Sequence, residues 1–162
     1  MDLSKGGEPK SRKSVYLAAP LFSQAERSFN LLLRSRLERH VSVFLPQEDG
    51  LLLTKLLSEG IQRDQAYKLV FERDVAAIQR CDGIVAVLDG RAIDEGVAFE
   101  LGLGFGLGKT SVGLQMDPRR LLGTGNNPMI DCALDEVFYE FEALDDWIDR
   151  WCAVPSTASD AA

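Results

Sequence analysis

Histidine and cysteine are scarce in this sequence, and their scarcity removes two kinds of site. The 162 residues include one histidine, His40, and three cysteines, Cys81, Cys132 and Cys152. The cysteines show no Cys-x-x-Cys spacing and their number is odd, so neither a Cys/His zinc site nor a complete disulfide framework is expected. Unpaired cysteines are typical of a reducing compartment, and we expect a cytoplasmic protein.

Basic charge and long apolar runs are also lacking. Eighteen Lys and Arg residues stand against 25 Asp and Glu, which gives a net charge of −7. A nucleic-acid partner requires a basic surface, so we expect none. No apolar run approaches the roughly 20 residues of a membrane helix, and the polar, basic N-terminus lacks the apolar stretch of a secretory signal. A small molecule is therefore the expected partner.

What the sequence does contain is the composition of a folded domain. Hydrophobic residues make up 46% and charged residues 27%, close to the globular average. We expect one domain over residues 14–154, which is long enough to bury a core. Residues 1–13 are predicted to be a disordered lead, and the Ala/Ser-rich residues 155–162 a disordered tail.

Short apolar runs alternate with helical spacing along this domain. The predicted strands are Val15–Pro20, Val41–Leu45, Gly83–Leu88, Thr110–Leu114 and Val137–Phe141. The predicted helices are Ser23–His40, with Ser23 and Glu26 in capping-box spacing, Arg63–Arg80, Asp94–Gly108 and Leu144–Cys152, while Gly50–Gly60 is a mobile helical or loop segment. The fold class is therefore α/β, a single-domain doubly wound sheet, flavodoxin-like or Rossmann-like, of about five mainly parallel strands flanked by helices.

The glycines of the third of these helices do not fit a nucleotide-binding motif. A P-loop ending at Gly108-Lys109-Thr110 would need glycine where Leu103 stands, and here a helix leads into a strand, the reverse of the required order. The alternating glycines likewise miss the Gly-x-Gly-x-x-Gly pattern at Leu107. We expect these glycines to let the helix pack closely on the sheet, and Lys109 to cap the C-terminal end of that same helix.

Three acidic residues lie near predicted strand ends, where ligands bind in such sheets. Glu100 lies in the second turn of its helix between Gly96 and Gly104, which leave space for a ligand although glycine costs a helix about 1 kcal/mol. A solvated glutamate is the alternative. Asp94 equally fits a plain helix N-cap, and Asp74 an exposed helix charge. Paired carboxylates in a cleft suit glycosidic chemistry, in which one attacks the anomeric carbon and another, with a raised pKa, protonates the leaving group.

Three segments resemble the nucleoside 2-deoxyribosyltransferase family, and the similarity extends from about Val15 to Trp147. CDGIVAVLDGRAIDEGVAFELGLGFGLGK, residues Cys81–Lys109, is similar to that family's strand, acidic loop and D-x-G-x-x-x-E-x-G helix start. VYLAAPLF, Val15–Phe22, resembles the first strand and substrate loop. GNNPM, Gly125–Met129, resembles a late Asn-x-Met segment.

The resemblance implies roles for nine residues. Glu100 would be the nucleophile that forms a 2-deoxyribosyl ester, and Tyr16, otherwise a core aromatic, would orient it. Asp74 and Asp94 would contact base and sugar, one of them relaying the proton to the leaving base. The implied substrate-binding residues are Phe22 near the sugar, Gln47 at the base edge, Gly96 at the helix start, and Asn127 and Met129, which a neighbouring subunit would supply around the 5′-hydroxyl.

The implied activity is base exchange between purine or pyrimidine 2′-deoxynucleosides and free nucleobases, with retention, in nucleotide salvage. It requires no metal or organic cofactor, and it implies a homo-oligomer with shared active sites. One alternative is a 2′-deoxynucleoside 5′-monophosphate N-glycosidase, which the apolar loop of residues 18–22 disfavours, although Ser23 and Arg27 keep it open. The other is a non-catalytic nucleotide-binding module, against which stands the complete set of Tyr16, Asp74, Asp94 and Glu100.

Overall fold

The computed structural model describes residues 12–119 and 125–154. Its elements are β1 (Ser14–Ala18), α1 (Gln24–Leu37), β2 (Ser42–Phe44), α2 (Pro46–Asp49), α3 (Leu53–Ser58), α4 (Arg63–Arg80), β3 (Gly83–Val87), α5 (Glu95–Gly106), β4 (Thr110–Leu114), α6 (Pro128–Asp131), β5 (Glu136–Phe138) and α7 (Phe141–Ala153). Residues 1–11 of the predicted lead and the whole predicted tail, 155–162, lie outside the described residues.

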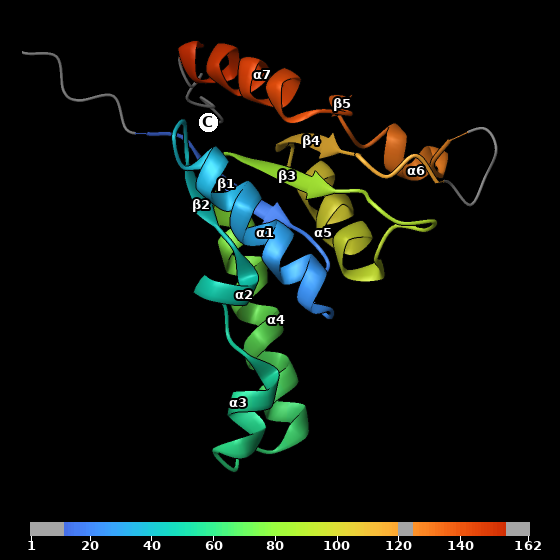
Figure 1. The fold of residues 1–162 in the computed structure, drawn as a ribbon. Helices are drawn as coiled ribbons and strands as arrows, with labels where there is room; N and C mark the ends of the chain where they lie inside the picture. Colours follow the sequence, from blue (N-terminus) through green and yellow to red (C-terminus); the bar gives the residue numbers. More distant parts are fainter. Residues whose placement is uncertain (1–11, 120–124, 155–162) are drawn as a thin grey trace, which may run out of the picture.

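The five strands form one parallel sheet in the order β2-β1-β3-β4-β5. This arrangement confirms the predicted doubly wound, flavodoxin-like fold, with helices on both faces of the sheet (Figure 1). The strand order reverses between β1 and β3, and ligands of such sheets bind beyond the carboxyl ends of the strands at this point. The fold therefore directs attention to the loops and helices that follow β1 and β3.

Alternation along the strands divides the core into two clusters. On β1, Val15 and Leu17 pack in one cluster with the buried leucines of α1 and α7. The alternate residues Tyr16 and Ala18 pack in the other cluster with buried residues of α4 and α5. Because neighbouring side chains of a strand point to opposite faces, each strand serves both layers of helices.

The ends of several elements differ from the prediction. The expected capping box of α1 is present, since Ser23 Oγ accepts from the Glu26 N–H and Glu26 accepts from the Ser23 N–H. Gly50–Gly60, by contrast, contains the regular helix α3. The last strand ends at Phe138, and the aromatic residue Phe141 begins α7 instead, where its ring stacks on Phe29 of α1 with centroids 6.0 Å apart.

The roles predicted for the glycines of α5 and for Lys109 need correction. A Cβ at Gly104 would clash with the Ile84 side chain of β3, which confirms close packing there, whereas Gly102 and Gly106 face open space. Lys109 Nζ donates to the carbonyl oxygens of Gln79 at 2.8 Å and Cys81 at 2.7 Å, so it caps the end of α4 and not its own helix. The prediction was wrong because the chain turns at Gly108, with φ +65°, and leaves the axis of α5.

The first half of α4 extends beyond the sheet and carries α3 against it (Figure 1). α4 has 18 residues, and its second half covers the sheet beside α5. The side of α4 that faces α5 therefore continues past the edge of the sheet. Of the helices in the described ranges, none is long and apolar enough to cross a membrane.

Candidate active site

The first turn of α5 sets the position of Glu100. Asp94 caps this helix, and its Oδ1 accepts hydrogen bonds from the N–H groups of Gly96 at 2.9 Å and Val97 at 3.1 Å. The plain N-cap interpretation of Asp94 is thus confirmed as its local role. A capped helix start is held against fraying, and the glutamate in the next turn is fixed with it.

Tyr16 connects the centre of the sheet to this glutamate. Its ring is fully buried on β1, and its hydroxyl donates a hydrogen bond to Glu100 Oε1 at 2.5 Å. Burial, and then the negative charge of Glu100, raise the pKa of Tyr16 far above its ordinary value. The phenol therefore remains a donor at all working pH values, as a group that orients a carboxylate must. Tyr16 is at once the core aromatic and the predicted partner of Glu100.

The two acids nearest the cavity both hold protons more tightly than usual. Burial raises the pKa of Glu100 to about 8, the charges of Asp74 and Asp94 act in the same direction, and the Tyr16 hydrogen bond opposes them. Burial raises the pKa of Asp74 to about 6 against the opposing charge of Arg73. Asp74 Oδ1 is buried and has no hydrogen-bond partner within the described residues. Perturbed carboxyls of this kind mark functional sites more often than surface charges do.

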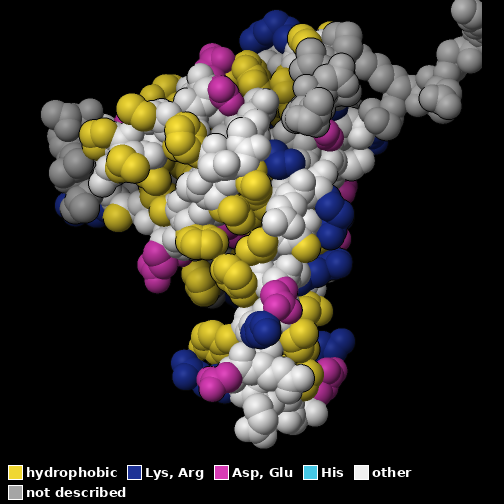
Figure 2. Space-filling view, turned by 180° about the vertical axis from the view of Figure 1, so that it is seen from behind, with side chains coloured by type: hydrophobic (Ala, Val, Ile, Leu, Met, Phe, Trp, Pro, Cys, Tyr) yellow, Lys and Arg dark blue, Asp and Glu magenta, His cyan; other side chains and the backbone are white. Residues whose placement is uncertain are grey.

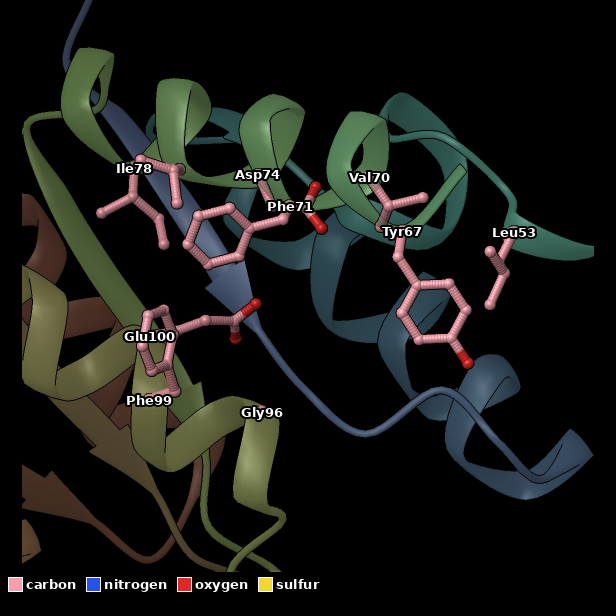
Figure 3. A pocket seen from close by; sticks show the side chains of 10 residues that line it. Leu53, Tyr67, Val70, Phe71, Asp74, Ile78, Gly96, Phe99 and Glu100 are labelled. Carbon is pink, nitrogen blue, oxygen red and sulfur yellow. The ribbon is translucent and has the colours of Figure 1, made fainter. Parts of the chain in front are cut away.

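A cavity of about 470 Å³ separates α4 from α5, within the usual size range of small-molecule sites. The carboxylates of Asp74 and Glu100 reach into it from the two helices (Figure 3). The wall is otherwise apolar and includes Leu53, Tyr67, Val70, Phe71, Val75, Ile78, Gly96 and Phe99. The structure brings three of the predicted site residues, Glu100, Asp74 and Gly96, into the wall of one cavity, whereas Asp94 acts on Glu100 through its charge and does not line the cavity.

Three aromatic side chains stand at the mouth of this cavity. Phe71 and Phe99 are each 55% exposed, and their ring centroids lie 5.9 Å apart at an interplanar angle of 52°. Tyr67 lies one turn before Phe71 on the projecting half of α4 (Figure 3). Apolar side chains gather on the molecular surface above the narrower projection (Figure 2). Exposed aromatic rings around a polar floor are typical of a surface that receives a flat ligand or a partner.

Two predicted substrate contacts lie away from the described wall of this cavity. The Phe22 side chain is 75% exposed, and its backbone N–H donates to Glu26. The Gln47 amide is already engaged with α1, accepting from Asn30 Nδ2 at 3.0 Å and donating to the Arg27 carbonyl at 3.3 Å. Contacts of these two residues with a substrate stay predictions.

Asn127 and Met129 belong to a second cavity, of about 450 Å³, between α6 and the other side of α5. Asn127 caps α6, and its Oδ1 accepts from the Met129 N–H at 2.9 Å. The Met129 side chain is 80% exposed. These two residues do not line the cavity that Asp74 and Glu100 of their own chain line.

Several wall residues were absent from the sequence prediction. Tyr67, Phe71 and Ile78 share one face of α4 with the predicted Asp74, and the four residues recur at spacings of four, three and four. Continuing this spacing from Asp74 would have found them. Leu53 gave no signal, because it comes from the segment that matched no motif. Across residues 12–119 and 125–154, no three His, Cys, Asp or Glu side chains are grouped so as to hold a metal ion.

The chain is similar to one protein family and to several solved structures. The profile of the nucleoside 2-deoxyribosyltransferase family matches residues 15–145. The structure resembles a conserved protein from Enterococcus faecalis V583, at 25% identity and a TM-score of 0.68 over 87% of this chain and 99% of that one. It also resembles a 2-deoxyribosyltransferase from Bacillus psychrosaccharolyticus, at 24% identity and a TM-score of 0.67 over 82% of this chain and 90% of that one. A third similar structure is a CMP N-glycosidase from Clostridium botulinum, at 19% identity and a TM-score of 0.53 over 86% of this chain and 99% of that one. No protein with a curated description matches in sequence.

Proposed function

The chain belongs to the nucleoside 2-deoxyribosyltransferase family, and from this premise we propose that it exchanges the base of 2′-deoxynucleosides through an ester on Glu100. The observation that carries the proposal is the Glu100 carboxyl, hydrogen-bonded to Tyr16 and facing the same cavity as Asp74. A pair of partly buried carboxyls, of which only Glu100 accepts a hydrogen bond from Tyr16, suits one nucleophile and one proton donor. Such an exchange would serve nucleotide salvage.

The proposed reaction has two displacements at C1′. In the first, a Glu100 oxygen bonds to C1′ while the C1′–N bond breaks, and the departing nitrogen takes its electron pair and the proton of Asp74. In the second, a nitrogen of the incoming base bonds to C1′, gives its proton back to Asp74, and releases Glu100 as a carboxylate. Two inversions give retention. Tyr16 donates to the carboxylate whenever it is free.

The proposed reaction needs a proton on Asp74 and none on Glu100, and this is the less favoured of the two one-proton forms of the free site. Because the pKa of Glu100 is about 8 and that of Asp74 about 6, the pair holds one proton between these values, mainly on Glu100. Catalysis needs that proton on Asp74. The Tyr16 hydrogen bond lowers the pKa of Glu100 and therefore favours the form in which Glu100 is ionised and Asp74 holds the proton.

The walls of the cavity favour a nucleoside over a nucleotide. None of the described residues that line it carries a basic side chain, and Asp74 and Glu100 would repel a phosphate. Phe71 and Phe99 offer ring faces on which a base can stack. We therefore propose 2′-deoxynucleosides and free bases as substrates.

One observation favours the monophosphate N-glycosidase as a second candidate. The Arg63 guanidinium lies 4.7 Å from the centre of the Tyr67 ring and donates to the Tyr67 hydroxyl at 3.3 Å. A cation at the rim of the cavity could receive a 5′-phosphate while water takes the place of the second base. If so, Arg63→Ala weakens monophosphate hydrolysis and leaves any nucleoside exchange unchanged.

We also propose that two or more copies share their sites, with Asn127 and Met129 of one copy closing the cavity of another near the 5′-hydroxyl. The support is their exposure and their place in a different cavity from the one that Glu100 lines. Mixing inactive Glu100→Gln subunits with inactive Asn127→Ala/Met129→Ala subunits should restore activity, because some mixed oligomers contain one intact site. No recovery, or full activity in a sedimenting monomer, would contradict sharing.

One assay separates the candidate functions. The protein is incubated with adenine and either deoxyinosine or its 5′-monophosphate. Deoxyadenosine is the expected product from deoxyinosine, whereas a monophosphate N-glycosidase releases hypoxanthine from the monophosphate and a binding module releases no base. A fluorinated deoxynucleoside then traps the ester, and mass spectrometry locates the label. We expect it on the peptide containing Glu100. Glu95→Gln, an exposed acid in the first turn of the same helix, is the matched control that keeps activity. A label on another peptide removes Glu100 from the mechanism.

A further inference from the structure

The Tyr16 hydroxyl can orient Glu100 only if its ring is held still. The hydroxyl lies at the far end of the side chain, so a small rotation of the ring axis moves the donor away from the carboxylate. Active-site groups have to stay within about 0.5 Å of their working geometry, and the residues behind them usually provide this constraint. The question is which side chain restrains Tyr16.

Phe44 is placed to do so. In the parallel pairing of β1 with β2, Phe44 is the register partner of Tyr16. The two rings stack with centroids 5.6 Å apart and an interplanar angle of 15°. Cross-strand aromatic pairs restrain each other and add stability beyond the area they bury. Phe44 does not line the described wall of the cavity, so its action on the site passes through Tyr16.

Arg73 in turn restrains Phe44. Its guanidinium carbon lies 5.5 Å from the centre of the Phe44 ring, and Nη2 donates to the backbone carbonyl of Asp49 at 3.0 Å. The Asp49 side chain accepts from the Leu45 N–H at 2.9 Å and forms an ion pair with Arg34 at 3.0 Å. A connected set of contacts therefore leads from α1 and α2, through Phe44, to the phenol on Glu100.

We propose that Phe44 is a positioning residue, which keeps the Tyr16 hydroxyl on Glu100 by stacking on its ring and is itself kept in place by Arg73. The role of Glu100 as nucleophile rests on the proposed function, but the positioning of its carboxyl does not. The titratable groups that face Glu100 are Tyr16 from β1, Asp74 from α4 and Asp94 at the start of α5, with Arg73 beside Asp74. Of these groups, Tyr16 is the one on whose ring Phe44 stacks.

The test follows the Glu100 carboxyl itself. In protein labelled with ¹³C-glutamate, the Glu100 signal is assigned by its loss in Glu100→Gln, and its titration is compared among variants. Because the Tyr16 hydrogen bond lowers the pKa of Glu100, Phe44→Leu should raise the midpoint, by about one pH unit for a lost hydrogen bond. Phe44→Tyr, which keeps a stacking ring, should restore the original midpoint.

A matched control lies on the other face of the sheet. Phe29 stacks on Phe141 much as Phe44 stacks on Tyr16, with centroids 6.0 Å apart, but has no path to Glu100 through a hydrogen bond. Phe29→Leu should therefore lower stability and leave the midpoint unchanged. In a Tyr16→Phe background, Phe44→Leu should produce no further shift, since the donor is already gone.

These outcomes separate the two proposals. An unchanged midpoint in Phe44→Leu, or an equal shift in Phe29→Leu, overturns the positioning role, as does a full additional shift in the Tyr16→Phe background. A shifted midpoint in a protein that exchanges no bases overturns the proposed function alone. If Phe44→Leu does not fold, Phe44→Met, which keeps the volume but not the ring, replaces it. With an active enzyme, Phe44→Leu should lower kcat about tenfold with little change in KM, because binding groups are untouched.

Discussion

The two faces of the sheet differ in what they bury. The hydrophobic cluster under α1 and α7 is aliphatic and aromatic apart from Cys152 at its edge, and the charged groups beside it are paired, with Arg36 of α1 binding Asp145 and Glu142 of α7. The face under α4 and α5 contains a buried phenol and two carboxyls with raised pKa values, beside an open cavity. One face of the sheet stabilises the fold, and the other carries groups that cost stability.

This difference shows how one strand can serve two purposes. Leu17 and Tyr16 are neighbours on β1 and are both fully buried, yet one packs under α1 and α7 and the other donates to Glu100. Because alternate residues point to opposite faces, the apolar layer anchors the backbone whose other side positions the chemistry. Substitutions on the two faces should therefore have opposite signatures.

The largest expected effect is that of Glu100→Gln, which should abolish activity and yet stabilise the protein. Loss of the nucleophile should lower kcat at least about a thousandfold. The folded pKa of Glu100 is about 8, above its ordinary 4.5, so ionisation is disfavoured by folding and the wild type loses stability as pH rises from 4.5 to 8. At pH 9 the variant should gain about 2–4 kcal/mol in free energy of unfolding. The gain should vanish at pH 4, and equal unfolding midpoints at both pH values would contradict it.

Leu37→Ala should do the reverse. Leu37 is fully buried in the cluster under α1 and α7, and its truncation should cost about 2–5 kcal/mol. Activity per folded molecule should remain near that of the wild type at a temperature where both are folded. Urea unfolding and base-exchange rates on the same samples measure the two quantities. A clear fall in kcat per folded molecule would show that the two faces are not independent.

Asp74→Asn should sharpen the comparison within the chemical face. With Glu100 at about 8 and Asp74 at about 6, we expect kcat/KM of the wild type to fall on both sides of a maximum between pH 6 and 8. Removing the proton donor should lower kcat/KM about a hundredfold and change this profile. Glu72→Gln, an exposed acid on the same helix, is the control. An unchanged bell in Asp74→Asn would assign the proton transfer to another group.

The smallest expected effects concern two glycines of α5. Gly102 faces open space, so Gly102→Ala should stabilise the protein by about 0.5–1 kcal/mol through helix propensity. Gly104 contacts Ile84 of β3, and Gly104→Ala should destabilise by about 1–3 kcal/mol through overpacking. Thermal unfolding of the pair compares the solvent side with the sheet side of one helix. A similar sign for both would contradict the packing described here.

Much of the fold could be predicted from the sequence because its signals are local. The apolar run at Gly83–Val87, the capping box at Ser23 and the cap at Asp94 each depend on a few neighbouring residues. Errors arose where distant contacts decide. Phe141 has the residue type of a strand, yet its stacking on Phe29 places it in α7, and Lys109 reaches α4 only after the chain folds back.

Glu100 could be singled out from the sequence because a motif and a helix position coincide there, whereas Asp74 was proposed only from the family resemblance. The aromatic rings of Phe71 and Phe99 were not foreseen, since each resembles an ordinary core residue until α4 and α5 are placed side by side. The stacking of Phe44 on Tyr16 requires the strand register, which no local pattern specifies. Side chains that act across elements need the tertiary structure.

The outermost strands of the sheet, β2 and β5, are three residues long. Strands this short present few free backbone groups. A second molecule therefore gains little by pairing with an edge of the sheet, and edge-to-edge aggregation is disfavoured. Copies that associate are therefore expected to meet through side chains of their helices. An assembly of that kind can form or be lost without disturbing the hydrogen bonds of the sheet.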